Sequence, residues 1–396
     1  MIKSNQKIPE GWSVKKLGNI IDTFSGGTPL VGESIYYENG TIPFIRSGEI
    51  YQNYTELYIT EKGLEESSAK MVKKGDLLFA LYGANSGEVA ISQINGAINQ
   101  AILCIRPKYD NVNYLNNVFV LVKDKILHKY LQGGQGNLSA EIVKSLNFVF
   151  PPLPEQEKIA EILETWDEAI EKLPGLIEQK KLLKKGLMQK LLTGKTRLPG
   201  FTQPWKEVKL SDFLKEHTEK TTENDQYQVL SVTKNGICSQ EEYFEKQIAS
   251  ENNIGYKILR KHDIVFSPMN LWMGSIGFSE YDIGIVSPAY KIFTVNENVA
   301  LFSFLKHFMI INRMIYLYLI NSEQGASIVR RNLDLDGLLS SKVSIPDIAE
   351  QQAIADVLST ADDEISLLNQ KLEALKEQKK SLMQQLLTGQ IRVKVN

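Results

Sequence analysis

The sequence predicts an α+β protein in which two globular domains are joined by two long antiparallel helices forming a coiled coil, with an internal pseudo-two-fold repeat. Three observations support this fold class. A segment of 41 residues occurs twice at a constant offset of 195, and each copy spaces its apolar residues by four and three. Each copy also follows about 150 residues of short β-like runs and polar turns. At 396 residues, the chain is longer than one hydrophobic core usually supports.

The repeat is clearest in residues 154–194 and 349–389, which begin PEQEKIAEIL and AEQQAIADVL and end LMQKLLTG and LMQQLLTG. Aligned without a gap, 20 of these 41 positions are identical, so the segment is a duplication. The preceding globular segments match only faintly, for example where Trp12 and Leu17 recur as Trp205 and Leu210. We therefore expect globular domains at 1–150 and 198–345, and helical segments at 151–197 and 346–396.

The first globular segment has β-like runs at 41–45, 76–80, 89–91 and 98–105, with one or two helical stretches between polar, glycine-rich turns. The second has such runs at 229–232, 263–267, 283–286 and 290–295. Its longest apolar stretch, 299–320, carries Lys306, His307, Asn312 and Arg313 and predicts a buried amphipathic helix rather than a membrane span. Loops rich in Arg, Asn, Gln, Ser and aromatic residues suit base edges and phosphates, although the same residues also dominate ordinary turns.

The two repeated segments predict a heptad seam. A proline-rich lead-in before Glu155 suits a helix start, while Gly194 and Gly389 suit helix ends. Each helix would span about 60 Å at 1.5 Å per residue. Its apolar stripe needs a partner, which we expect to be the other copy rather than an unrelated surface. The seam residues are Ile159, Leu163, Trp166, Ile170, Leu173, Ile177, Leu187 and Leu191 in the first helix, and Ile354, Leu358, Ala361, Ile365, Leu368, Leu372, Leu375, Leu382 and Leu386 in the second.

Pro174 and Gly175 lie at the middle of the first seam, where the second copy has Asn369 and Gln370. A proline inside a helix costs about 3 kcal/mol and kinks or splits it. The sequence therefore predicts a break in the first helix at this point.

Charge and composition give little support to a lone nucleic-acid binder. The net charge is −2, and no segment is markedly basic. The two cysteines, Cys104 and Cys238, are far apart, which excludes a thiolate metal cluster and suits a reducing cytosol. The opening residues MIKSNQKIPEGW lack an apolar core, so we expect no signal peptide and a cytoplasmic protein.

Motifs for catalysis are missing. Gly194, Lys195 and Thr196 resemble the end of a phosphate-binding loop, but the glycine required five residues earlier is Gln189. No glycine-rich cofactor loop, no paired metal ligands and no nucleophile–base spacing is visible, and the four histidines are scattered singly. The pattern predicts a binding protein without cofactor or metal rather than an enzyme.

Longer motifs carry a resemblance to a known family. Two variable domains are each followed by a long helix, the first opening PPLPEQEKIA and closing LLKKGLMQKLLTGKTR, and IPFIRSGEI at 42–50 and KGDLLFA at 74–80 add to the match. The whole chain thus resembles the specificity subunit of type I restriction–modification enzymes, a system of bacterial defence. Two departures are the interruption at Pro174 and Gly175, and Ala349 in place of a proline such as Pro154.

The resemblance implies that each globular domain is a target-recognition domain reading one half of an asymmetric, bipartite site in double-stranded DNA. The helices would set the spacer and bind two methyltransferase subunits, which carry S-adenosylmethionine and methylate adenine, and restriction (translocase–nuclease) subunits would join them. The polar loops of each domain supply the candidate DNA contacts, which are Thr28, Arg46, Ser47, Asn85 and Gln135 in the first domain and Lys234, Asn235, Asn270, Trp272, Arg330 and Arg331 in the second.

Two other classes stay open. Near-neutral charge suits a coiled-coil scaffold with two protein-binding heads and no direct DNA reading. A self-contained methyltransferase–nuclease is disfavoured by the missing cofactor motifs. A purified chain that methylated DNA alone would reinstate this second class.

Overall fold

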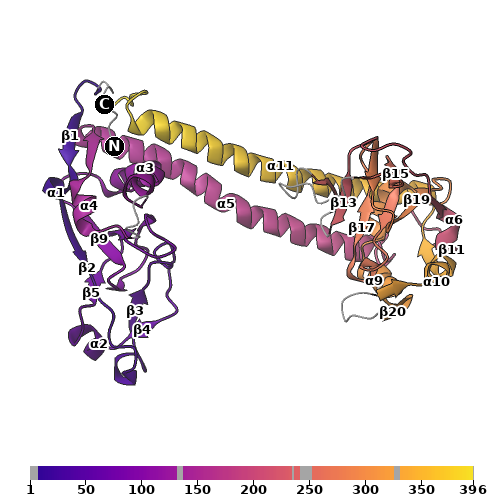
Figure 1. The fold of residues 1–396 in the computed structure, drawn as a ribbon, viewed down its shortest axis with the longest axis horizontal. Coiled ribbons are helices and arrows are strands. Elements are labelled where there is room, and N and C mark those ends of the chain that lie inside the picture. Colours follow the sequence, from indigo (N-terminus) through magenta and orange to yellow (C-terminus); the bar gives the residue numbers. More distant parts are fainter. Residues whose placement is uncertain (1–7, 132–136, 234–235, 241–251, 325–330, 396) are drawn as a thin grey trace. The chain divides into compact units, whose positions relative to one another are not determined.

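The computed structural model describes residues 8–131, 137–233, 236–240, 252–324 and 331–395. The chain forms two compact units, residues 1–174 with 371–396 and residues 175–370. Each unit contains one globular head and parts of two long helices, α5 (Leu153–Leu191) and α11 (Ile348–Leu387) (Figure 1). The duplication in the sequence thus corresponds to two units of the same composition.

The first head is built on two four-stranded sheets, in the orders β2-β9-β6-β7 and β4-β3-β8-β5. The strands are β2 (Ile21–Ser25), β3 (Ile42–Ile45), β4 (Tyr58–Ile59), β5 (Lys70–Val72), β6 (Leu77–Ala80), β7 (Val89–Ile91), β8 (Gly96–Ile98) and β9 (Ile102–Pro107). A separate pair joins β1 (Ser13–Lys16) to β10 (Asn147–Phe150). The helices are α1 (Leu17–Ile20), η1 (Ser34–Tyr36), α2 (Glu61–Glu65), α3 (Val112–Leu131) and α4 (Ala140–Ser145).

The second head repeats this plan in part. Its larger sheet has the order β12-β19-β16-β17, and β11 pairs with β22 as β1 does with β10. The strands are β11 (Lys206–Lys209), β12 (Leu214–His217), β13 (Leu230–Thr233), β14 (Gly236–Ser239), β15 (Lys257–Arg260), β16 (Ile264–Phe266), β17 (Ile276–Phe278), β18 (Ile283–Val286), β19 (Lys291–Val295), β20 (Ser322–Gln324), β21 (Arg331–Leu333) and β22 (Lys342–Ile345). The helices are α6 (Leu210–Phe213), η2 (Leu271–Met273), α8 (Phe302–Phe308), α9 (Asn312–Ile320) and α10 (Leu335–Ser340).

Each head shares one hydrophobic core with the ends of the long helices. In the first unit, Ile159 and Leu163 of α5 and Leu386 of α11 pack with α3 and the β2-β9-β6-β7 sheet. The repeated residues Ile354, Leu358 and Leu191 pack in the same way in the second unit. Burying apolar side chains is the main favourable contribution to folding, so each helix end is held by its head.

Polar contacts at the helix starts are duplicated too. Gln156 accepts a hydrogen bond from the Asn111 backbone amide at 2.9 Å and donates to the Pro151 carbonyl at 2.9 Å. Gln351 does the same with Leu301 at 2.8 Å and Pro346 at 2.9 Å. Both glutamines are buried, and each ties the start of a long helix to the start of a head helix, α3 or α8.

The long helices pair in antiparallel fashion within each unit. Asp167 of α5 bonds Lys379 of α11 in the first unit, and the duplicated pair, Lys184 with Asp362, recurs in the second. Gly194 and Gly389, with positive φ of 69° and 71°, follow the helix ends as expected. The predicted seam residues are all buried or half-buried: Ile159, Leu163, Trp166, Ile170, Leu173, Ile177, Leu187, Leu191, Ile354, Leu358, Ala361, Ile365, Leu368, Leu372, Leu375, Leu382 and Leu386.

The expected break at Pro174 is wrong, because α5 continues through this residue. Proline removes one helix hydrogen bond, but Leu173 and Ile177 on either side of it are buried and hold the helix in place.

Two expected elements are divided. Residues 98–105 belong to β8 and β9 with a turn between them, and 299–320 form α8 and α9. Within the described residues, no helix is long and apolar enough to cross a membrane.

Candidate nucleic-acid interface

The loops of the first head converge on one edge because of strand pairing. In the sheet β2-β9-β6-β7, Ser25 pairs with Leu103 and Ala80 with Ile102, so the ends of β2 and β6 lie beside the start of β9. In the other sheet, β3 runs parallel to β8, which brings Ile45 beside Ile98. The loops that follow β2, β3, β6 and β8 therefore leave their sheets at matching ends.

Four of the predicted contact residues lie in these loops. Thr28 is exposed, and its hydroxyl bonds the Gln100 side chain at 2.7 Å. Ser47 and Asn85 are half-buried on neighbouring loops, where a Cβ added at Gly48 would lie 3.4 Å from Asn85 Nδ2. Close packing requires a glycine at position 26, since a Cβ on Gly26 would lie 1.8 Å from the Ile98 carbonyl oxygen.

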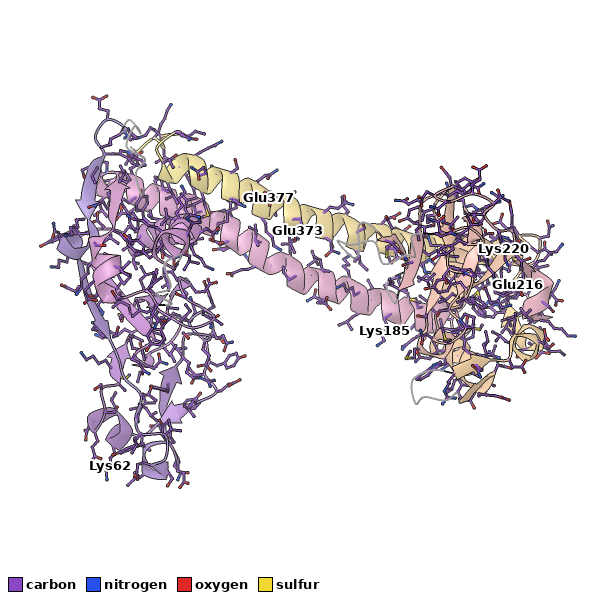
Figure 2. All side chains as sticks on the ribbon, viewed as in Figure 1. Lys62, Lys185, Glu216, Lys220, Glu373 and Glu377 are labelled. Carbon is purple, nitrogen blue, oxygen red and sulfur yellow. The ribbon has the colours of Figure 1, made fainter. Side chains whose placement is uncertain are left out.

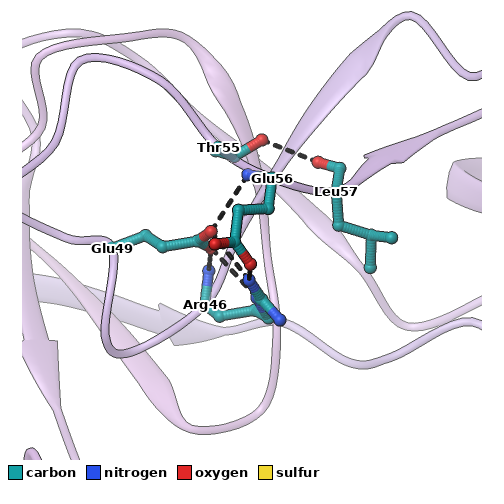
Figure 3. A network of polar contacts seen from close by, with 5 residues as sticks. All are labelled: Arg46, Glu49, Thr55, Glu56 and Leu57. Atoms are coloured by element: carbon teal, nitrogen blue, oxygen red, sulfur yellow. Dashed lines mark hydrogen bonds and ion pairs between the residues drawn. The ribbon is translucent and has the colours of Figure 1, made fainter.

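The fourth residue, Arg46, is bound within its own loop. Its guanidinium donates to Glu49 through Nε at 3.1 Å and Nη2 at 2.9 Å, and to Glu56 at 2.6 Å (Figure 3). Hydrogen bonds to Glu49 and Glu56 raise the pKa of Arg46. Burial opposes ionisation of Glu49, but hydrogen bonds from Arg46 and two backbone amides outweigh it and lower the pKa of Glu49. The charge of Arg46 is therefore already neutralised by two carboxylates.

The second head gathers loops at one sheet edge in the same way. Phe266 pairs with both Lys291 and Ile276, and His217 pairs with Ile292. The loop 267–275 and the segments that follow β12 and precede β19 therefore leave the sheet at one edge. Asn270 and Trp272 belong to this loop, in which the Met273 amide bonds the Asn270 carbonyl at 3.0 Å.

Trp272 and Arg331 are brought together from separate elements. The Arg331 guanidinium lies 5.2 Å from the centre of the Trp272 ring, a cation–π distance. The Arg331 backbone amide bonds the Met269 carbonyl at 3.3 Å, and its Nη1 bonds the Ser322 carbonyl at 3.2 Å. The Trp272 ring nitrogen is buried and finds no acceptor among the described residues. Gln135, Lys234, Asn235 and Arg330 lie outside the described residues.

Three lysines at the edge of the second head were missed by sequence reasoning. Lys257 is buried, donates to the Tyr290 carbonyl at 2.6 Å and bridges backbone with the exposed Lys220. Lys291 bonds Glu216 at 2.9 Å; Figure 2 labels Glu216 and Lys220. Burial and the nearby Lys291 lower the pKa of Lys257. Lys220, Lys257 and Lys291 are at least 34 positions apart in the sequence, so no local motif marks them.

No group of three or more His, Cys, Asp or Glu side chains within the described ranges is placed to hold a metal ion. The edges instead offer hydroxyl, amide, aromatic and cationic groups. These groups bind by hydrogen bonding and stacking, which is the chemistry of recognition. The fold and these edges define a protein with two separate recognition heads on paired helices.

Comparison with known proteins gives the family. The model of the type I restriction modification DNA specificity domain matches residues 9–179 and, a second time, residues 202–377. The chain belongs to this family and contains two copies of its domain.

Curated relatives of the chain are specificity subunits of type I restriction enzymes. The MjaVIII specificity subunit of the type I restriction enzyme from Methanocaldococcus jannaschii is 25% identical, over 98% of this chain and 95% of its own. The EcoR124I/EcoR124II specificity subunit from Escherichia coli is 27% identical over 39% of this chain and 40% of its own.

Solved structures share the fold. The S subunit of a type I restriction–modification system from M. genitalium has a TM-score of 0.56 at 14% identity, covering 98% of this chain and 97% of that one. The HsdS subunit from Thermoanaerobacter tengcongensis has a TM-score of 0.54 at 16% identity, covering 99% of this chain and all of that one. The α+β fold with two domains and two long helices is therefore confirmed.

Proposed function

We propose that the chain is the DNA sequence-specificity subunit of a type I restriction–modification complex, and that each head reads one half of a bipartite, asymmetric site. The observation that carries this proposal is the double match to a DNA specificity domain, one copy for each head. The convergence of polar loops at one sheet edge in each head supports it physically, because base edges are read by such hydrogen-bonding groups.

The two half-sites differ because the two heads offer different groups. The first edge presents Thr28, Ser47 and Asn85, and the second presents Asn270 and the stacked pair of Trp272 and Arg331. Gln135, Lys234, Asn235 and Arg330 complete the proposed contacts. Arg46, the remaining predicted contact, is bonded to Glu49 and Glu56, so in this proposal it meets DNA as part of the loop that it helps to hold.

The functional segments of this proposal are target-recognition domains at 1–150 and 198–345, and spacer helices at 151–197 and 346–396. The length of the helix pair sets the unread spacer between half-sites. Support comes from α5 and α11, which at 39 and 40 residues are each about 60 Å long. Such helices exceed one DNA turn of about 34–36 Å.

The helices also dock two methyltransferase subunits, one on each unit. Leu182 and Leu183 of α5 are 66% and 57% exposed, and Leu367 of α11 is 65% exposed, all in the second unit. With the seam residues at positions a and d of the heptad, Leu183 lies at a g position and Leu367 at a c position. These two positions lie on the same side of an antiparallel pair, so the two leucines share one outward face. Exposed apolar groups of this kind suit a partner helix.

The repeated positions in the first unit have different chemistry. Leu182, Leu183 and Leu367 correspond to Glu377, Gln378 and Lys172, all exposed (Figure 2 labels Glu377). Apolar contact on one unit and polar contact on the other make the two docking positions unequal.

Catalysis belongs to the partners. The methyltransferase subunits supply S-adenosylmethionine and methylate adenine, the restriction subunits cut, and this chain contributes selectivity as a non-enzymatic, cytoplasmic subunit without a cofactor. The net charge of −2 fits such a division, because partner subunits then supply much of the salt-sensitive phosphate affinity.

Mapping of methylated adenines across a genome tests the function. Cells that express the methyltransferase subunit with this chain should carry methylation at one two-part motif, and cells without the chain should lack it. A variant with the second head replaced by a copy of the first is the control, and should convert the motif to a symmetric one. An unchanged methylation map after deletion of the chain would exclude the proposal.

A second candidate is a coiled-coil scaffold with two protein-binding heads, which the near-neutral charge favours. A gel-shift assay with partner subunits and DNA separates the two. The scaffold predicts a shift that is independent of DNA sequence, and the specificity subunit predicts one that is not.

A further inference from the structure

The loop formed by residues 46–57 is closed at its base by a buried carboxylate. Glu49, 6% exposed, accepts hydrogen bonds from the backbone amides of Arg46 and Glu56, both at 3.0 Å, and from the Arg46 guanidinium (Figure 3). The Leu57 carbonyl accepts from the Phe44 amide at 2.8 Å and from the Thr55 hydroxyl at 2.6 Å. The two ends of the loop are thus fixed to each other and to β3.

The tip of this loop carries free polar side chains. Tyr54 is 58% exposed, Asn53 is exposed, and neither side chain forms a hydrogen bond with the described residues. Tyr51, by contrast, donates to Glu88 at 2.5 Å, and Glu88 also pairs with Lys123 of α3. Tyr51 therefore ties one side of the loop to the rest of the head and leaves Asn53 and Tyr54 facing solvent.

The charge of the loop favours contact with bases over contact with phosphates. Arg46 is paired with both Glu49 and Glu56, so the cluster of one cation and two carboxylates is negative overall. A phosphate would be repelled by this excess charge. An amide such as that of Asn53 forms two hydrogen bonds with the edge of adenine, and an aromatic ring such as that of Tyr54 stacks on a base or inserts between bases.

We propose that Asn53 and Tyr54 are specificity-determining residues of the first head, and that Glu49 is the positioning residue that presents them. The inference rests on the proposed function and names the group in the first head that reads bases. A loop closed before binding loses less conformational freedom when it binds, so it discriminates between sequences more strongly than a loose one.

Methylation of a DNA library tests the two tip residues. The complete complex is given DNA with the first half-site randomised and the second kept native, and the reverse library is measured in parallel. Asn53→Ala and Tyr54→Ala should each reduce discrimination at one or two positions of the first half-site, on the order of 10- to 100-fold, and leave the second unchanged. Tyr109→Ala is the matched control, because Tyr109 is 82% exposed and follows the other end of β9.

The positioning role of Glu49 needs a separate readout. In Glu49→Gln, an amide replaces the carboxylate that holds Arg46, so hydrogen exchange at the Arg46 and Glu56 amides should accelerate and discrimination at the first half-site should fall. The head should still unfold in a single transition, and discrimination at the second half-site should stay unchanged. Glu38→Gln, at an exposed residue of the same head, is the control.

The outcomes separate this inference from the proposed function. A wild-type complex that methylates without sequence preference would overturn the proposed function. A selective wild-type complex whose Asn53→Ala and Tyr54→Ala variants keep full selectivity would overturn only the inference. So would a loss of affinity that is equal for all sequences, because it would indicate contact with phosphate.

Discussion

At the scale of single residues, one cluster around a buried glutamate occurs in both units. Glu155 accepts hydrogen bonds from Trp12 Nε1 at 3.1 Å and from Arg392 at 2.6 and 2.8 Å. Glu350 does the same with Trp205 at 3.3 Å and Arg197 at 2.5 Å. Each cluster joins the first turn of a long helix to the chain that follows the other long helix. This role accounts for the presence of the same two residues, Glu155-Gln156 and Glu350-Gln351, in both copies of the repeat.

Removal of the Glu155 carboxylate should destabilise the first unit. Glu155→Ala leaves the Trp12 ring nitrogen and the Arg392 guanidinium without this acceptor. The expected cost is limited to about 2 kcal/mol, because Arg392 is partly exposed and water replaces part of the lost contact. Urea unfolding of the full chain, followed at the transition of the first unit, measures the loss. Glu168→Ala on the same helix removes only the exposed pair with Lys172 and should cost less than about 1 kcal/mol. Equal losses in the two variants would contradict the role given to the cluster.

The stability of the second unit should fall in mild acid because of His307. This side chain is 3% exposed and faces Ser359 and Asp362 of α11. Burial, with Lys184 and Lys306 nearby and Asp362 opposing them, lowers the pKa of His307 from 6.5 to about 4. Between these pH values the unfolded chain binds a proton that the folded unit does not, so stability declines as pH falls from about 6.5 to 4.

Thermal unfolding measured from pH 7.5 to 5 tests this dependence. His307→Gln should flatten the curve over that range, and His128→Gln, at an exposed histidine of the first head, should leave it unchanged. A wild-type curve that is already flat would show that His307 is not buried in its neutral form.

At the scale of elements, α5 is continuous although it contains Pro174. Pro174→Ala restores a backbone hydrogen bond to the Ile170 carbonyl and removes a ring clash, so the free energy of unfolding should rise, by up to about 3 kcal/mol. Denaturant unfolding measures the gain. Asn369→Ala alters the corresponding exposed position of α11 and should change stability by less than about 1 kcal/mol. A loss of stability in Pro174→Ala would mean that the proline geometry is required.

The exposed leucines of the second unit give a second prediction for the helices. Leu182→Glu with Leu183→Gln copies the residues of the first unit onto the second and should weaken one methyltransferase position. Native mass spectrometry should then show complexes with one methyltransferase subunit in place of two at equal protein concentration. Glu377→Ala with Gln378→Ala changes the repeated positions of the first unit and is the control. Two subunits retained in the leucine variant would contradict unequal docking.

At the scale of the whole molecule, helix length should determine the spacer in the DNA motif. Insertion of one heptad into α5 and one at the facing level of α11 preserves the seam and lengthens each helix by about 10 Å. We expect the spacer to grow by about three base pairs while both half-site sequences stay the same. Sequencing of methylated motifs measures this. An unchanged spacer would show that the helices do not set it.

Much of the fold was predictable because it depends on spacing over short stretches of chain. The 41-residue segment repeated at an offset of 195, and heptad positions such as Leu163 and Leu358, predicted the helices, their ends and their pairing. The β-like runs anticipated strands such as β6 and β16. The candidate site was predictable only as a set of loops, and Thr28 and Asn85 lie in those loops. The hydrogen bonds from Arg46 to Glu49 and Glu56 were not predicted.

The sequence by itself therefore determined the two-copy architecture, the helix seam and the kind of residue in the loops. Only the tertiary structure decided which loops meet at one edge, because β3 and β8 pair across about 50 residues of chain. It also decided that Glu155 meets Arg392, 237 positions away, and that α5 continues through Pro174. The physical reason is the range of the interactions. Periodicity is set by neighbouring residues, whereas long-range pairing is set by burial and charge over a whole unit.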